Sequence, residues 1–260
     1  MVTRDTAWLP GTPCWVDLTV DDMDQATAFY GALFGWTVDV NPDPQFGGHG
    51  NFKLDGRDVA GVGPAMEPGQ PPVWTTYIAT DDVDRTASKV TESGGSVLPP
   101  GKLEIGPFGT MIIATDPSGA VFGVWQSGQH YGAQVANVVG SVTWNENLSR
   151  ELEGNKKFYT EVFGYSYGDM SADGFNYVTL DLNGAPVGGM GDLPPQAPAE
   201  TPAHWMTYFA VPDTDATVAK VKELGGTVIG EPFDTPQGRI AMLADNQGAH
   251  FAVINIAEES

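Results

Sequence analysis

Cysteine, basic side chains and long apolar runs are all scarce in this sequence, and each shortage excludes a class of protein. Cys14 is the single cysteine, which rules out an internal disulfide and a cysteine-based zinc cluster. Only 12 lysine and arginine residues stand against 33 acidic residues, and the net charge of −21 disfavours binding to nucleic acid or to an anionic membrane. No apolar run approaches the roughly 20 residues of a membrane span, and the first residues show no signal-peptide pattern. We therefore expect a soluble, cytoplasmic protein with no nucleic-acid and no membrane partner.

What the sequence does contain is a repeat of itself. Phe29-Tyr30 followed by Phe34-Gly35-Trp36 returns as Phe158-Tyr159 followed by Phe163-Gly164-Tyr165. Three further pairs keep nearly the same displacement, which is 129 residues from Trp15 to Trp144, 131 from Trp74 to Trp205 and 129 from Asp116 to Asp245. A period near 130 residues has the size of a whole domain. The pattern predicts a tandem duplication with domains at 10–127 and 139–257, a polar linker at 127–138, and halves that each fold alone when the chain is cut near Ala133.

Each half divides again into two similar quarters. Hydrophobic alternation and turn residues predict a strand at 13–20, a helix at 23–34 and strands at 36–41, 50–54 and 57–63. Asp21 and Asp22 are candidate caps of the helix, and Gly35 ends it. The second quarter repeats this order with a strand at 73–80, a helix at 83–93 and strands at 96–98, 109–115 and 120–126. The third and fourth quarters repeat it at 141–191 and 204–256.

Alternation along the strands also predicts which side chains lie opposite the helices. Val16, Leu18 and Val20 share the helix-packed face of the first strand, so Trp15 and Asp17 point the other way. The same alternation places a set of residues opposite the helices in each half, several of them aromatic. In the first half these are Trp15, Asp17, Thr19, Gly61, Tyr77 and Trp125, and in the second half they are Trp144, Glu146, Gly189, Tyr208, His250 and Ile254. Strand 141–148 is an exception, because the alternation turns Asn145 and Asn147 towards the helices.

Four strand-helix-strand-strand-strand modules, with Phe-Tyr late in the helix and Phe-Gly-Trp just after it, resemble the vicinal oxygen chelate superfamily. This superfamily contains glyoxalase I, bleomycin-resistance proteins and extradiol dioxygenases, and the chain looks most like its tandem glyoxalase-like members from actinomycetes. The resemblance implies an α+β fold of tandem domains, in which two paired βαβββ modules form a concave mixed sheet around a pocket.

Enzymes of this superfamily hold a divalent metal with His, Gln or Glu from the first and last strands of the paired modules. The corresponding positions here are Trp15, Thr75, Gly61 and Gly123 in the first half and Trp144, Met206, Gly189 and Ala252 in the second. None of these side chains is a usual metal ligand. We therefore expect no metal and no other cofactor.

The residues expected opposite the helices favour binding of a small aromatic or amphipathic molecule. Aromatic walls with one carboxylate suit a flat ligand with a polar group, and the expected ligand-binding residues are Trp15, Asp17, Tyr77, Trp125, Trp144 and Tyr208. Glu146 and His250, expected on neighbouring strands, form a candidate general acid–base pair. The remaining histidines, His49, His130 and His204, are assigned no chemistry.

Three hypotheses remain open at this point. The first is a metal-free protein of the glyoxalase and bleomycin-resistance type that sequesters or detoxifies a small molecule. The second is an enzyme, either a glyoxalase-like lyase or isomerase or an oxygenase of the hydroxylase or dioxygenase type. The third is a structural protein, such as a homodimer, in which the aromatic side chains fill the pockets.

Overall fold

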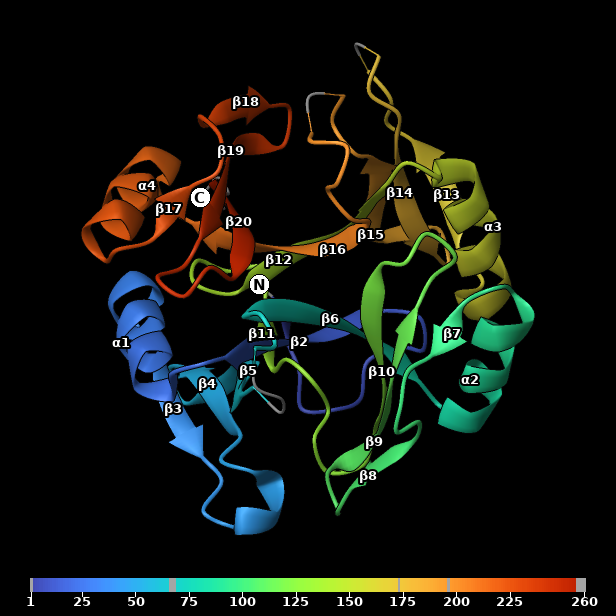
Figure 1. Ribbon diagram of the computed structural model, residues 1–260, viewed down its shortest axis with the longest axis horizontal. Helices are drawn as coiled ribbons and strands as arrows, with labels where there is room; N and C mark the ends of the chain where they lie inside the picture. Colours follow the sequence, from blue (N-terminus) through green and yellow to red (C-terminus); the bar gives the residue numbers. More distant parts are fainter. Residues whose placement is uncertain (1, 66–68, 173, 196, 256–260) are drawn as a thin grey trace.

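The computed structural model describes residues 2–65, 69–172, 174–195 and 197–255 (Figure 1). The predicted second domain ends at residue 257, so its last two residues lie outside the described part of the chain. No helix among the described residues is long and apolar enough to cross a membrane.

The first half forms one mixed sheet with two helices on one side. Its strands run in the order β3-β4-β5-β2-β6-β10-β9-β7, with β8 paired to β9. The bounds are β2 Pro13–Val20, α1 Met23–Phe34, β3 Thr37–Val40, the 3₁₀ helix η1 Pro44–Phe46, β4 Gly50–Leu54, β5 Arg57–Pro64, β6 Val73–Thr80, α2 Val83–Glu92, β7 Ser96–Val97, β8 Leu103–Ile105, β9 Gly109–Thr115 and β10 Val121–Ser127.

The second half repeats this sheet in the order β13-β14-β15-β12-β16-β20-β19-β17, with β18 paired to β19. Its bounds are β12 Val142–Ser149, α3 Leu152–Phe163, β13 Ser166–Asp169, β14 Tyr177–Leu182, β15 Ala185–Asp192, β16 His204–Val211, α4 Thr214–Glu223, β17 Thr227–Val228, β18 Phe233–Thr235, β19 Gly238–Ala244 and β20 His250–Asn255. The four predicted βαβββ modules and the α+β class are therefore confirmed.

Short strands are what the sequence did not predict. β8 and β18 have three residues each, and a separate two-stranded sheet joins β1 (Val2–Thr3) to β11 (Val135–Ala136). Strands of two or three residues carry too few alternating side chains for a sequence pattern, and they exist because a neighbouring strand pairs with them.

The two modules of each half join through their first strands. β2 pairs with β6 antiparallel, placing Trp15 opposite Tyr77, and β12 pairs with β16 in the same way, placing Trp144 opposite Tyr208. The pairing makes one continuous sheet per half. One face of that sheet carries the helices, and the face opposite the helices is here called the concave face.

The helix-packed faces of the two sheets pack against each other, and each core combines both halves. One cluster joins Phe29 and Trp74 of the first half to Phe209 and Phe251 of the second, and the other joins Phe122 to Phe158 and Trp205. Accordingly α1 lies beside α4 and α2 beside α3 in Figure 1. The expectation that each half folds alone does not fit this arrangement, because separation would expose both cores to water.

Polar Asn145 and Asn147, which the alternation turns towards the helices, find hydrogen-bond partners at this interface. Asn145 is buried, and its Oδ1 accepts hydrogen bonds from Thr76 Oγ1 of the other sheet at 3.0 Å and from Thr207 Oγ1 of its own sheet at 3.1 Å. Asn147 is likewise buried and donates to Asp116 at 3.0 Å. The polar side chains therefore do face the core, where partners from the opposite half satisfy them.

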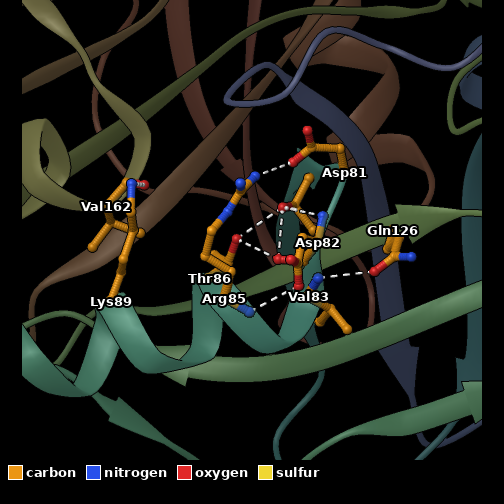
Figure 2. Close-up of polar contacts among 9 residues, drawn as sticks. Asp81, Asp82, Val83, Arg85, Thr86, Lys89, Gln126 and Val162 are labelled. Atoms are coloured by element: carbon orange, nitrogen blue, oxygen red, sulfur yellow. Dashed lines mark hydrogen bonds and ion pairs between the residues drawn. The ribbon is translucent and has the colours of Figure 1, made fainter.

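The first two helices begin at aspartate caps, as their sequence indicates. Asp22 caps α1 by accepting from the Gln25 backbone N–H, and Gly35 ends it in the left-handed conformation with φ 74°. Figure 2 shows the start of α2, where the Asp82 carboxylate accepts from Arg85 N–H. Further along α2, Lys89 reaches the Val162 carbonyl of α3 at 3.4 Å, which links the two halves at the surface.

Candidate functional site

The concave face of the first half carries the predicted aromatic residues, and the chain itself covers them. Trp15, Tyr77 and Trp125 are only 7%, 9% and 7% exposed and form a small cluster of their own, separate from the two main cores. Their location opposite the helices agrees with the strand alternation. Contact with a ligand stays a prediction for these three residues.

The cover is made by the segment that links the halves. The His130 ring meets the Trp15 ring edge-on with 4.5 Å between centroids, and Trp125 Nε1 donates to the His130 carbonyl at 2.9 Å. Gly132 approaches the Cys14 backbone so closely that an added Cβ would lie 2.4 Å from the Cys14 carbonyl oxygen. Residues 128–133 therefore lie tightly against this face.

A His–carboxylate pair lies on the same face. His49 Nε2 is 2.7 Å from Asp17 Oδ2, and Trp15 Nε1 donates to the same oxygen at 3.4 Å. The Asp17 carboxylate raises the pKa of His49, while partial burial acts in the opposite direction. Sequence reasoning assigned no chemistry to His49, which the structure brings into contact with a predicted site residue.

The concave face of the second half is built around Glu146. This side chain is 7% exposed, and it accepts hydrogen bonds from Tyr208 at 2.5 Å and from Tyr177 at 2.7 Å. Trp144 Nε1 in turn donates to the Tyr177 hydroxyl at 2.8 Å. Three predicted site residues, Trp144, Glu146 and Tyr208, therefore lie in one network, together with Tyr177, which was not predicted.

Burial sets the protonation behaviour of this network. Removal from water raises the pKa of Glu146 above its usual range, although the hydrogen bonds from Tyr208 and Tyr177 partly lower it. Burial and the neighbouring Glu146 charge raise the pKa of both tyrosines, so both hydroxyls stay protonated and act as donors.

His250 is separate from this network. It is exposed at the start of β20, and β16 lies between β20 and the strand β12 that carries Glu146. The sequence-based expectation that these two residues occupy neighbouring strands is therefore wrong. Within the part of the chain that the structure describes, no hydrogen bond or ion pair joins Glu146 to His250. His250 lies instead near His204, whose pKa is lowered mainly by burial.

The glycines expected at metal-ligand positions leave room for other side chains. An added Cβ on Gly61 would lie 1.9 Å from Asp17 Oδ2, and one on Gly189 would lie 1.8 Å from the Tyr177 hydroxyl. Across the described ranges, no group of three or more His, Cys, Asp or Glu side chains is positioned to hold a metal ion. The residues present do not fit the divalent metal that the superfamily uses.

The repeat relates the two concave faces, and it pairs two functional residues that the sequence did not predict, His49 and Tyr177. His49 and Tyr177 are 128 residues apart, as are Gly61 and Gly189, and each contacts the carboxylate of its own half. Gly63 and Gly191 leave room for these two side chains, since an added Cβ would lie 2.9 Å from His49 and 2.7 Å from Tyr177. Comparing the halves position by position therefore pairs His49 with Tyr177.

Two surface hollows lie away from both carboxylates. One, of about 240 Å³, lies between α2 and α3 and is lined in part by Arg85, Lys89 and Phe163. The other, of about 560 Å³, adjoins the start of α3 and the β13–β14 hairpin. Neither includes a residue of the two networks above.

Four βαβββ modules paired into two concave sheets define a tandem protein of the vicinal oxygen chelate fold. The chain belongs to the Glyoxalase/Bleomycin resistance protein/Dioxygenase superfamily, whose family model matches residues 14–124 and 148–253.

Curated relatives match along almost the whole chain. CFP32 of Mycobacterium tuberculosis, provisionally named a glyoxylase, is 45% identical over 256 residues, covering 96% of each chain. The anthracycline biosynthesis protein DnrV of Streptomyces peucetius is 38% identical over 267 residues, covering 97% of this chain and 96% of that protein.

Solved structures show the same fold at low sequence identity. The Mn(II)-bound glyoxalase of Novosphingobium aromaticivorans matches with a TM-score of 0.64 and 20% identity, covering 95% of this chain and 83% of that one. The 2,3-dioxygenase LapB of Pseudomonas sp. KL28 matches with a TM-score of 0.63 and 15% identity, covering 97% of this chain and 93% of that one.

Proposed function

We propose that this protein binds a small, flat, largely apolar molecule on the concave face of its second half, without using a metal ion. The observation that carries the proposal is the partly exposed Trp144 indole beside the buried Glu146 carboxylate. Met206, Tyr208 and Ile254 form the apolar floor of this face, and Ile240 and Met242 pack against it while remaining partly exposed. An aromatic wall with one polar anchor suits a planar ligand that carries a hydrogen-bonding group.

Differences between the two halves favour the second half as the ligand-binding face. Trp15, at the repeat position of Trp144, is buried under residues 128–133, whereas Trp144 is partly exposed. At the edge of the first face the Phe46 and Phe108 rings meet with 5.4 Å between centroids. The repeat position of Phe108 is Gln237, and on the second face Phe175, one residue beyond Gly174, stacks on Tyr177 with 5.9 Å between centroids.

Glu146 supplies the polar anchor. Each of its oxygens accepts one tyrosine hydroxyl, and a carboxylate oxygen can accept a second hydrogen bond. A ligand hydroxyl or amine placed there would meet a carboxylate in a region of low dielectric, where such a bond is strong. The name of DnrV supports the ligand class, since anthracyclines contain a flat, fused aromatic ring system.

The proposed biological setting is sequestration or detoxification of such a compound. Catalysis of a glyoxalase-like or dioxygenase-like reaction is the alternative, but its usual form requires a metal site. Gly61 and Gly189 stand at the metal-ligand positions, and the space a ligand side chain would need there is filled by Asp17 and Tyr177, which counts against metal-dependent catalysis.

Isothermal titration calorimetry with 2-(hydroxymethyl)anthraquinone tests the proposal. We expect saturable binding that EDTA does not change and that Trp144→Ala weakens by severalfold to tenfold, because a stacked indole contributes about 0.5–1.5 kcal/mol beyond its buried area. Trp15→Ala, the same substitution at the repeat position, should leave the affinity unchanged. Absence of binding, loss of binding in EDTA, or equal affinity in the wild type and the Trp144 variant would overturn the proposal.

A further inference from the structure

The His49–Asp17 pair is an acid–base pair that the proposed ligand site does not use. Its 2.7 Å contact joins Nε2 of the imidazole to the carboxylate, and the two side chains are 41% and 17% exposed. The pair is therefore largely anchored yet reachable from solvent, which is what a proton-transfer group requires.

The first half is shaped around this pair. Gly61 leaves the space that Asp17 occupies, and Gly63 leaves the space beside the His49 ring. Trp15 Nε1 adds a second hydrogen bond to Asp17 Oδ2. Asp17 is thus fixed from two directions, and a fixed carboxylate holds an imidazole in one orientation and stabilises its protonated form.

The other ring nitrogen of His49, Nδ1, is not engaged by Asp17. Nδ1 makes no hydrogen bond within the part of the chain that the structure describes, while Nε2 is held by Asp17. With the Nε2 proton directed at the carboxylate, Nδ1 carries the lone pair and is the proton acceptor.

Aromatic and charged side chains lie on the same face as the pair. Phe46 and Phe108 are partly exposed, and the Phe46 carbonyl accepts a hydrogen bond from the His49 backbone. The charged and titratable groups near the pair include Tyr77 beside Asp17, His130 from the covering segment, and the Lys53–Asp58 ion pair, with 2.7 Å between Nζ and Oδ1. Aromatic side chains on the same face as a base favour a flat ligand with an acidic O–H group.

We propose that His49 and Asp17 form a proton-accepting site for hydroxylated aromatic compounds, such as phenols and hydroxyquinones, on the first half of the chain. The phenolic O–H bond breaks, its electron pair stays on oxygen as phenolate, and the proton forms a new N–H bond at His49 Nδ1. Asp17 stabilises the resulting imidazolium, and no oxidant or reductant takes part. The neighbouring carboxylate also raises the pKa of His49, which strengthens the imidazole as a base.

The site is independent of the second-half ligand site and can be tested separately. The probe is 4-nitrophenol, because its phenolate and phenol forms differ in absorbance. We expect the wild-type protein to bind it and to lower its apparent pKa by about one unit, a tenfold shift of the ionisation equilibrium. His49→Gln and Asp17→Asn should each abolish that shift.

His250→Gln is the matched control, since it makes the same substitution at an exposed histidine outside both networks. It should leave the 4-nitrophenol shift intact. The variant His49→Gln changes a partly exposed side chain, so it reports on the site even where Asp17→Asn fails to fold. A wild-type protein that leaves the pKa of 4-nitrophenol unchanged, or a shift that survives His49→Gln, would overturn the inference. Binding of the non-ionising anthraquinone reports on the second half alone, so the two proposals can fail separately.

Discussion

Tyr30 of the first half donates a hydrogen bond to Asp245 of the second half, with 2.9 Å between Oη and Oδ2. Its repeat, Tyr159 of the second half, does the same to Asp116 of the first at 3.1 Å. A tryptophan donates to each hydroxyl, Trp74 at 3.0 Å and Trp205 at 2.9 Å. The repeated Phe-Tyr motif and the repeated aspartates, Asp116 and Asp245, therefore bind each half to the other.

The two tyrosines should differ in their contribution to stability. Tyr30→Phe leaves Asp245 Oδ2 without any hydrogen bond seen in the described structure, whereas Tyr159→Phe leaves Asp116 Oδ2 with the amides of Asn147 and Asn155. A buried acceptor that loses its partner costs about 1–3 kcal/mol, and more when it is charged. We expect Tyr30→Phe to lower the free energy of unfolding by that amount and Tyr159→Phe by less. Urea denaturation of both variants measures the difference, and equal losses would contradict this account of the interface.

The halves should depend on each other for folding. We expect residues 1–133 and 134–260, produced separately, to show no cooperative thermal transition, because each core cluster takes residues from both. Mixing or co-expressing the fragments should restore one transition. Circular dichroism on each fragment and on the mixture decides the matter, and a cooperative transition in either fragment alone would show that one half is a self-sufficient domain.

Removal of metal should not affect stability. A ligand stabilises the folded state only in proportion to its binding there, and the residues at the superfamily's metal positions do not suit a divalent ion. We therefore expect the same melting temperature with and without EDTA. A fall of several degrees, reversed by adding back Mn²⁺ or Zn²⁺, would show that another set of side chains holds a metal.

Glu146 should make stability depend on pH in a defined direction. Its pKa is raised in the fold, so its stabilising contribution is complete below the unfolded-state value of about 4.3 and is lost as the pH rises through the folded-state value. We expect the wild type to lose stability relative to Glu146→Gln as the pH rises from about 4.3 towards neutrality. Urea denaturation across that range provides the measurement.

Glu161→Gln is the control for this pH dependence, because Glu161 is exposed on α3. Its stability difference from the wild type should stay constant over the same range. A Glu146→Gln difference that is flat, or that slopes the other way, would mean that the two tyrosine hydrogen bonds outweigh burial.

Local patterns in the sequence determined the repeat, the order of the elements and the face on which each strand residue lies. A two-residue period fixes the face of Trp15, Trp144 and Glu146 without knowledge of the rest of the fold. The same alternation turned Asn145 towards the core, where the structure supplies its threonine partners. The unsuitability of the metal positions also follows from residue identity, since an indole or a glycine cannot replace an imidazole ligand.

Only the tertiary structure decided which modules share a core and which side chains meet across a face. The pairing of α1 with α4, the segment over Trp15, and the contact of His49 with Asp17 join residues brought together by loops and sheet packing. Strand order separated His250 from Glu146 by one intervening strand. Such contacts depend on the path of the chain between elements, and side-chain periodicity within an element carries no information about that path.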